Sequence, residues 1–161
     1  MKKYLKELLF IVVALFLISN AISYTRSQDL NQQSLNIDTL TLIDGTTYTI
    51  KNDRPTIVYF WATWCPICKL TSSNIDFLAK YLNVLSIAVS SKNDEDIAEY
   101  MDSKELSFLV YNDRDGNLAN SSNIKVFPTI MIYDKNGKLY SSDVGYSSTF
   151  MLMIKYILAS Y

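Results

Sequence analysis

The chain has 161 residues, of which 49% are hydrophobic and 19% are charged, and its formal net charge is -1. This length suits one domain with a short addition, and the near-neutral charge gives no sign of a nucleic-acid-binding surface. Because the chain contains no histidine, it lacks the usual base of Ser-His-Asp and Cys-His catalysis and the commonest transition-metal ligand.

Residues 1–24 have the pattern of a secretory signal or a signal-anchor. Lysines near the start precede a run without polar side chains at 8–18. A membrane-spanning helix needs about 20 apolar residues, so the stretch is just long enough if it continues to Tyr24. We expect a retained transmembrane segment. A cleaved signal, favoured by the small residues at 19–21, and a soluble amphipathic or buried helix are the alternatives.

The N-terminal lysines also predict which side of the membrane the rest of the chain occupies. Positive charge stays on the cytoplasmic side, so the chain after the apolar run is expected to be exported. Residues 25–39 are polar and rich in Gln, Asn and Ser, and we expect them to link the membrane segment to a domain at 40–161. The protein is thus predicted to be a single-pass protein of the inner (cytoplasmic) membrane. Its domain is expected on the periplasmic or extracytoplasmic side, where disulfide chemistry belongs.

The pattern of residues 40–161 predicts an α/β fold. Asp44-Gly45 between alternating residues indicates a β-hairpin at 40–50. A polar turn is expected at 113–123. Hydrophobic periodicity predicts five further strands at 56–60, 84–89, 108–111, 129–133 and 138–144, and helices at 65–82, 94–104 and 147–161. Parallel strands joined by helices and closed by an antiparallel hairpin give a central mixed sheet flanked by helices.

The last predicted helix is expected to pack against the sheet through one apolar face. Ser147 and Ser148 are suited to cap its N-terminus. Its predicted inner face consists of Phe150, Met153, Ile154, Ile157, Leu158 and Tyr161.

Cys65 and Cys68, the two cysteines of the chain, lie where a predicted strand meets a predicted helix. A cysteine at a helix N-terminus faces unpaired backbone N–H groups and the positive end of the helix dipole. Both stabilise the thiolate, which is the form that attacks disulfides. Pro66 falls in the first helical turn, where its missing N–H costs nothing. We therefore predict that Cys65 is the exposed nucleophile and that Cys68, on the inner helix face, is the shielded resolving thiol.

Other roles are open to the cysteine pair. A structural disulfide across so short a loop would constrain little of the unfolded chain. A zinc site needs four ligands, so metal binding would need a site shared between two chains or a two-coordinate Cu(I) thiolate site. Catalytic exchange is the better prediction, and it needs no metal and no cofactor besides the redox-active Cys65–Cys68 disulfide.

The segment at 60–69 reads Phe-Trp-Ala-Thr-Trp-Cys-Pro-Ile-Cys-Lys and resembles the active-site segment of the thioredoxin superfamily. It is most similar to the exported TlpA-like branch, which includes membrane-anchored disulfide oxidoreductases related to the suppressor-of-copper-sensitivity proteins. The resemblance covers 40–161. It implies a thioredoxin fold with an N-terminal β-hairpin extension, preceded by one N-terminal hydrophobic helix. It also implies that Trp64, Pro66 and Ile67 support the active site.

A second matching segment, Val-Phe-Pro-Thr at 126–129, stands at the start of a predicted strand. In the superfamily a cis-proline faces the CxxC pair, and the backbone before it docks substrate. By this resemblance Pro128 is the cis-proline, Phe127 is an aromatic that contacts substrate, and Thr129 is a neighbour with a backbone role. An ordinary strand-start proline and a packed aromatic are the alternatives.

Two positions depart from the family pattern. Many thioredoxins carry a buried Asp six residues before the first cysteine, where this chain has Tyr59. TlpA-like proteins of cytochrome c maturation often carry a Glu three residues after the second cysteine, where this chain has Thr71. Such an acid handles the proton of the resolving thiol. Its absence argues against a cytochrome c maturation reductant, and a water or Tyr59 is the substitute open to the site.

The predicted function is thiol–disulfide exchange on exported cysteine-containing proteins, with an oxidant or general exchanger favoured. An oxidant needs a membrane partner that reoxidises the pair, whereas a reductant needs electrons from a transmembrane carrier of the DsbD or CcdA type. The alternatives are a TlpA-like reductant for cytochrome c maturation and a non-enzymatic module that binds Cu(I) or docks a partner. Membrane association through the N-terminal helix is expected, and nucleic-acid binding is not.

Overall fold

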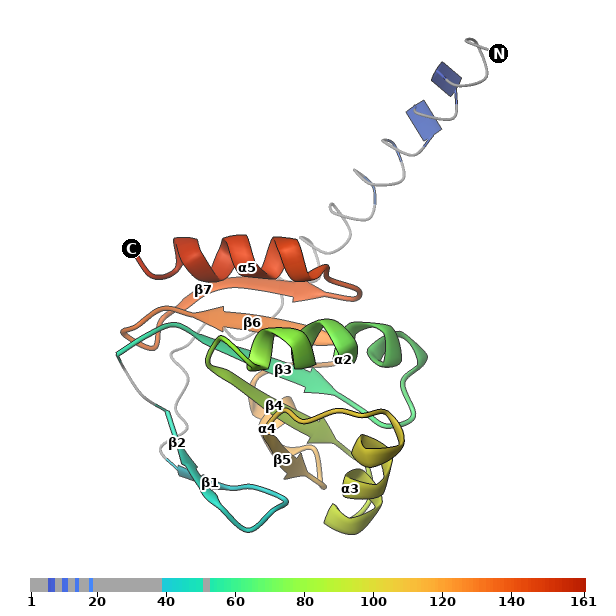
Figure 1. Ribbon diagram of the computed structural model, residues 1–161, viewed down its shortest axis with the longest axis vertical. Coiled ribbons are helices and arrows are strands. Elements are labelled where there is room, and N and C mark those ends of the chain that lie inside the picture. Colours follow the sequence, from blue (N-terminus) through green and yellow to red (C-terminus); the bar gives the residue numbers. More distant parts are fainter. Residues whose placement is uncertain (1–5, 8–9, 12–13, 15–17, 19–38, 51–52) are drawn as a thin grey trace.

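The structure, a computed structural model, describes residues 6–7, 10–11, 14, 18, 39–50 and 53–161 (Figure 1). The described residues before position 19 are helical, but most of the membrane segment predicted at 1–24 lies outside the described residues. The predicted linker at 25–39 also lies outside them, except for Thr39, which begins the first strand. Within the described part of the chain, no helix is both long enough and apolar enough to cross a membrane.

The predicted β-hairpin at 40–50 is confirmed, with shorter strands than expected. Its strands form a separate two-stranded antiparallel sheet, β1 (Thr39–Thr41) and β2 (Thr47–Thr49). Gly45 has a φ of 79°, a left-handed conformation that side chains disfavour. The Asp44 carboxylate accepts hydrogen bonds from the backbone N–H and the hydroxyl of Thr46, at 2.9 and 2.6 Å. The Asp-Gly pair therefore forms the turn for which its residue types are suited.

The main sheet is mixed, as predicted, and has the strand order β5-β4-β3-β6-β7 (Figure 1). Strands β3, β4 and β5 are parallel, β6 is antiparallel to β3, and β7 is antiparallel to β6. Every residue of β3, β4 and β6 is buried, which accounts for their continuous apolar runs. The bounds of the strands are β3 (Thr56–Trp61), β4 (Val84–Val89), β5 (Val110–Asp113), β6 (Thr129–Tyr133) and β7 (Leu139–Val144).

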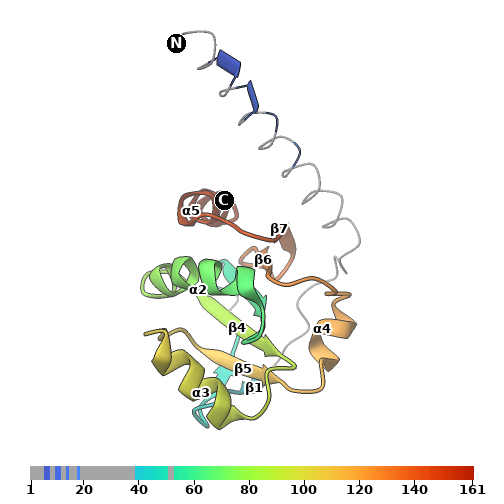
Figure 2. The same cartoon turned by 90° about the vertical axis from the view of Figure 1, so that its right-hand side faces the viewer.

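Helices α2 (Pro66–Ala79), α3 (Asp94–Ser103) and α5 (Thr149–Leu158) lie on one face of the main sheet, and α4 (Asn117–Ser121) lies on the other (Figure 2). Helices α2 and α3 each connect neighbouring parallel strands in the same direction along the sheet, so right-handed crossovers place them on the same side. The larger core cluster joins α2, α3 and α5 to the sheet, and a second cluster contains Ala119 of α4.

The prediction of a polar turn at 113–123 was wrong, because α4 lies within it. The buried carboxylate of Asp113 accepts hydrogen bonds from the backbone N–H groups of Leu118 and Ala119, at 3.1 and 2.8 Å. A helix of five residues is too short for hydrophobic periodicity to reveal. Its stability comes instead from an aspartate that β5 holds in place.

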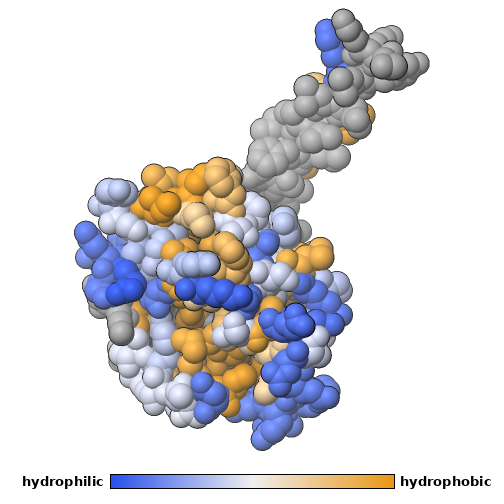
Figure 3. Space-filling model, viewed as in Figure 1, coloured by the Kyte–Doolittle hydropathy of each residue, from blue (hydrophilic) through white to orange (hydrophobic). Residues whose placement is uncertain are grey.

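The predicted inner face of the last helix was also wrong, except for Met153, which packs against the larger core cluster. The buried side chains of α5 are Leu152 and Tyr156. The other five predicted inner residues are exposed, from 36% for Ile154 to 99% for Tyr161, and the apolar surface over α5 is visible in Figure 3. The helix is apolar nearly all round, so periodicity could not select a face. An ion pair between Lys155 and Asp143 of β7 (2.7 Å) helps to determine which side faces the sheet.

Candidate active site

The two cysteines lie at the junction of β3 and α2, as predicted. Cys65 has an extended backbone conformation and is the N-cap of α2, and Pro66 is the first residue of the helix. The Cys68 N–H donates a hydrogen bond to Cys65 Sγ, at 3.2 Å. The two residues form a disulfide with 5.3 Å between their Cα atoms. The N-terminus of α2 therefore directs a backbone donor at Cys65 Sγ, an arrangement that stabilises a thiolate there.

The expectation that Cys65 is exposed was wrong for this disulfide form. Cys65 is 4% exposed and Cys68 is fully buried. Cys65 is therefore the more exposed of the two, as predicted, but both cysteines are shielded from solvent. The reason is packing: Cys65 belongs to the larger core cluster, and Phe127 packs against that cluster. A substrate must therefore approach Cys65 closely, past the neighbouring side chains, to reach its sulfur.

The cis-proline motif lies beside the cysteine motif. The Phe127–Pro128 peptide bond is cis, as predicted. The rings of Phe127 and Trp64 meet edge to face, with 5.8 Å between their centroids. Gly145 N–H donates to Pro128 O at 2.8 Å, which attaches the start of β6 to the end of β7. Chain segments that are far apart in the sequence thus form one surface around the disulfide.

That surface is apolar and accessible. Trp64 is 60% exposed and Ile67 is 46% exposed. Phe127 is half-buried and packs against Trp64 and the larger core cluster. Val126 is also exposed, at 39%. Sequence reasoning missed Val126 as a surface contributor, although its place in the cis-proline motif was the available signal. An exposed apolar surface of this kind is typical of a site that contacts another molecule.

The other predicted support residues have more local roles. Pro66 is exposed at the helix start. Thr129 is 1% exposed and donates through its hydroxyl to Val126 O, at 2.7 Å, so it shapes the loop before Pro128 and does not face substrate. Trp61 belongs to the same segment at 60–69 but was not a predicted support residue. It is fully buried and its indole N–H donates to Ser86, at 3.2 Å, which makes it a core residue.

Tyr59 lies beneath the resolving cysteine. Its hydroxyl donates to the backbone carbonyl of Cys68 at 3.3 Å and lies 3.0 Å from the hydroxyl of Ser72. Tyr59 is fully buried and Ser72 is 1% exposed. Burial raises the pKa of the Tyr59 phenol far above its ordinary value of 10.0, against the opposing effect of the Ser72 hydrogen bond, so Tyr59 is neutral. No sequence pattern indicated that Ser72 contacts Tyr59, because the contact depends on how closely α2 packs against β3.

The one carboxylate of α2, that of Asp76, has partners away from the cysteine pair. Asp76 accepts hydrogen bonds from the backbone N–H and the hydroxyl of Ser107, at 2.6 and 2.9 Å, and pairs with Lys80 at 3.3 Å. Burial alone would raise the pKa of Asp76, but the Ser107 hydrogen bonds and Lys80 outweigh it and hold that pKa below 3.8. Asp76 therefore anchors the loop before β5 and is not an acid for the cysteine pair.

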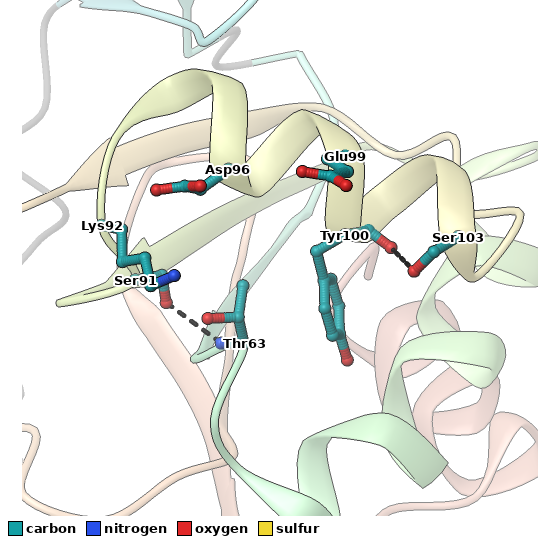
Figure 4. A pocket seen from close by; sticks show the side chains of 7 residues that line it. All are labelled: Thr63, Ser91, Lys92, Asp96, Glu99, Tyr100 and Ser103. Carbon is teal, nitrogen blue, oxygen red and sulfur yellow. Dashed lines mark hydrogen bonds between the residues drawn. The ribbon is translucent and has the colours of Figure 1, made fainter.

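A polar pocket of about 310 Å³ lies next to the loop that carries the motif (Figure 4). It is bounded by α3 and by Thr63, whose backbone N–H donates to the Ser91 hydroxyl at 3.0 Å. Neither cysteine and none of the predicted support residues lines it. Among the described residues, no cluster of three or more His, Cys, Asp or Glu side chains is arranged to hold a metal ion.

Known proteins resemble this chain along most of its length. A family model described as Redoxin matches residues 27–153. A "Thioredoxin-like protein" of Haemophilus influenzae is 31% identical over 99% of this chain and 97% of its own length. The "Thiol-disulfide oxidoreductase ResA" of Bacillus cereus is 27% identical over 90% of this chain and 91% of its own length.

Solved structures have the same fold. A secreted Mycobacterium tuberculosis disulfide oxidoreductase, described as homologous to E. coli DsbE, superposes with a TM-score of 0.65 at 19% identity. The match covers 74% of this chain and 94% of that one. With the sheet order and the helix placement, this similarity confirms the predicted thioredoxin fold of the described domain.

Proposed function

The chain belongs to the Redoxin family and is a thiol–disulfide oxidoreductase with the pair Cys65–Cys68. On this premise we propose that it oxidises dithiols of exported proteins to disulfides or exchanges their disulfides. The observation that carries the proposal is the Cys65–Cys68 disulfide at the N-terminus of α2, beside the cis-Pro128 loop. The exposed apolar side chains around it supply a surface for a cysteine-containing polypeptide.

The proposed oxidation proceeds in two exchanges. A substrate thiolate attacks Cys65 Sγ, forms a mixed disulfide, and displaces Cys68 as a thiolate. A second substrate thiolate then attacks the substrate sulfur of the mixed disulfide and displaces Cys65 as a thiolate. The substrate has lost two electrons and gained a disulfide, and the enzyme pair is reduced. The Cys68 N–H, 3.2 Å from Cys65 Sγ, and the helix dipole stabilise the leaving Cys65 thiolate.

The surroundings of Cys68 support an oxidant or a general exchanger. A carboxylate beneath the resolving cysteine would oppose its thiolate by like-charge repulsion. Here the positions that carry acids in reductant relatives hold Tyr59 and Thr71, and the Tyr59 hydroxyl contacts the Cys68 carbonyl. Without a nearby negative charge the reduced pair is more stable, and a more stable reduced pair makes a stronger oxidant.

We place the domain on the extracytoplasmic side of the inner membrane, anchored by residues 1–24. The lysines before the apolar run at 8–18 support this orientation, and a fold relative from Mycobacterium tuberculosis is secreted. The proposal requires a membrane redox partner. For an oxidant that partner reoxidises Cys65 and Cys68, and for a reductant it is an electron donor of the DsbD or CcdA type.

The reduction potential of the full-length chain in detergent tests the direction. We expect a value between about -200 and -120 mV in glutathione buffers, the range of oxidants and exchangers. A value at or below about -270 mV, the level of thioredoxin, would overturn the proposed direction and favour a reductant such as those of cytochrome c maturation. A Cys65→Ser variant cannot form the intramolecular disulfide, so it gives the background signal of the measurement. Titration of the reduced protein with copper tests the alternative that the cysteine pair binds Cu(I).

A further inference from the structure

The hydroxyl groups of Tyr59 and Ser72 form a buried pair on the inner side of α2, next to Cys68. We propose that this pair sets the proton affinity of the Cys68 thiol, as two positioning residues of which one, Tyr59, stands where many thioredoxins carry a buried acid. The inference rests on the proposed thiol–disulfide exchange and assigns a role to a phenol and a hydroxyl that the exchange steps alone do not use.

The geometry places the Tyr59 hydroxyl at the backbone of the resolving cysteine and the Ser72 hydroxyl against Tyr59. Tyr59 extends from β3, with its ring stacked on Trp61 at 6.3 Å between centroids. Its hydroxyl oxygen lies 3.3 Å from the carbonyl oxygen of Cys68 and 3.0 Å from Ser72 Oγ. Cys68 and Ser72 stand one helical turn apart on α2, so the phenol bridges the two residues from below.

A count of hydrogens shows how the pair can respond when the disulfide opens. In one arrangement Tyr59 donates to the Cys68 carbonyl and Ser72 donates to Tyr59. In the other, Tyr59 donates to Ser72, and the Ser72 hydrogen is free to turn toward a new acceptor. Both arrangements keep the same oxygen positions. An opened disulfide creates such an acceptor, because it leaves a buried thiolate on Cys68.

The surroundings leave these hydroxyls without competition from charged groups. The larger core cluster contains Tyr59 and Cys68, and its other titratable members are Cys65, Tyr156 and the partly buried Tyr100. Among the described residues the buried carboxylates are Asp76 and Asp113, and no basic side chain is buried. Asp113 accepts hydrogen bonds from the backbone of α4.

The charged residues of α2 are turned elsewhere. Lys69 is exposed, and Asp76 is held by Ser107 and Lys80. Because burial keeps the Tyr59 phenol neutral, the pair acts through hydrogen bonds and adds no charge. A donor to the thiolate lowers the pKa of Cys68, whereas a carboxylate in the same place would raise it.

The test compares Tyr59→Phe and Ser72→Ala with Thr71→Val in the full-length chain. Thr71 is a matched control, since its hydroxyl is also buried on α2 but donates to Ile67 O at 3.3 Å. In the reduced protein, thiolate absorbance followed against pH reports the two cysteine titrations. We expect both test variants to raise the pKa of the later-titrating cysteine by about one unit, whereas the control should leave that pKa unchanged.

The glutathione equilibrium gives a second readout that a merely structural role would not produce. Above the pKa of Cys68, we expect Tyr59→Phe to shift the equilibrium about tenfold toward the disulfide, or about 30 mV for a two-electron couple. Below that pKa the difference from wild type should vanish, because the thiol is then protonated in both proteins. Because wild type and variant are measured in the same buffers, the titration of glutathione affects both equally and cancels from their difference.

The outcomes are distinct. If both test variants titrate like Thr71→Val, and differ from wild type only in thermal stability, the inference is wrong. Ser72→Ala keeps the test decisive if Tyr59→Phe fails to fold. The reduction potential of the wild type tests the proposed direction of exchange. The pH-dependent difference between the variants and the wild type tests the role of the Tyr59–Ser72 pair. Each proposal can therefore fail while the other holds.

Discussion

The indole ring of Trp64 and the phenyl ring of Phe127 meet edge to face, with 5.8 Å between centroids and 83° between ring planes. The contact joins the cysteine motif to the cis-proline motif. Both rings present apolar surface where a polypeptide must approach the shielded sulfur of Cys65, so the pair is placed to hold substrate as well as to join the two loops.

Replacement of Phe127 by Ala is expected to lower kcat/KM for a reduced dithiol protein about tenfold, the effect of losing one favourable aromatic contact. The rate with glutathione, which is too small to use the apolar surface, should change little. The two rates are compared by stopped-flow fluorescence. Tyr161→Ala is the control because that side chain is 99% exposed, and an equal loss in the control would contradict the assignment.

The roles of the two cysteines can be separated by trapping. Cys68→Ser should accumulate a mixed disulfide between Cys65 and an oxidised protein substrate, because no second thiol resolves it. Cys65→Ser should trap little, because Cys68 is fully buried. Non-reducing electrophoresis after acid quenching and alkylation measures both adducts. Trapping of equal amounts by the two variants would show that Cys65 is not the preferred nucleophile.

Asp76 should contribute stability that depends on pH. Its pKa lies below 3.8 because its hydrogen bonds with Ser107 and its pairing with Lys80 outweigh the effect of burial. The stabilisation is therefore present above about pH 4–5, where the unfolded carboxyl is ionised, and is lost as pH falls through the folded pKa. Asp76→Asn should cost about 1–3 kcal/mol at pH 7 and less near pH 3. Urea unfolding at both pH values checks this, with the exposed Asp102→Asn as control; a loss independent of pH would refute it.

The two faces of α5 should respond differently to truncation. Leu152 is fully buried, whereas Phe150 is 72% exposed. Leu152→Ala should lower the free energy of unfolding by about 2–5 kcal/mol, and Phe150→Ala by less than about 0.5 kcal/mol. Chemical denaturation of both variants measures the difference. A large loss from Phe150→Ala would mean that this face is covered in solution.

Anchoring by residues 1–24 predicts a specific behaviour in cells. In a bacterial host, the full chain should remain with the membrane fraction, and its reduced Cys65 should react with a membrane-impermeant maleimide. Removal of residues 1–24 should leave the protein in the cytoplasm, where that reagent cannot reach it. Release of a shortened chain into the periplasm would instead identify a cleaved signal.

The sequence alone determined the features that depend on local chemistry and period. The position of Cys65 and Cys68 at a strand–helix junction followed from an apolar strand and a helical pattern on either side of them. The alternation of strands and helices predicted the mixed sheet, and the Asp44-Gly45 pair predicted the hairpin turn. These inferences succeed because a turn, a helix start and a buried strand each leave their pattern within a few consecutive residues. The resemblance of the Val-Phe-Pro-Thr segment to the superfamily supplied the cis form of Pro128.

Tertiary structure decided what each of these residues touches. The shielding of Cys65 by Phe127 and the hydroxyl pair of Tyr59 and Ser72 depend on neighbours from other elements of the fold. The apolar sequence of α5 suited either face, and packing against the sheet together with the Asp143–Lys155 ion pair selected one. Burial and hydrogen bonding are properties of contacts across the fold, so no local pattern could have supplied them.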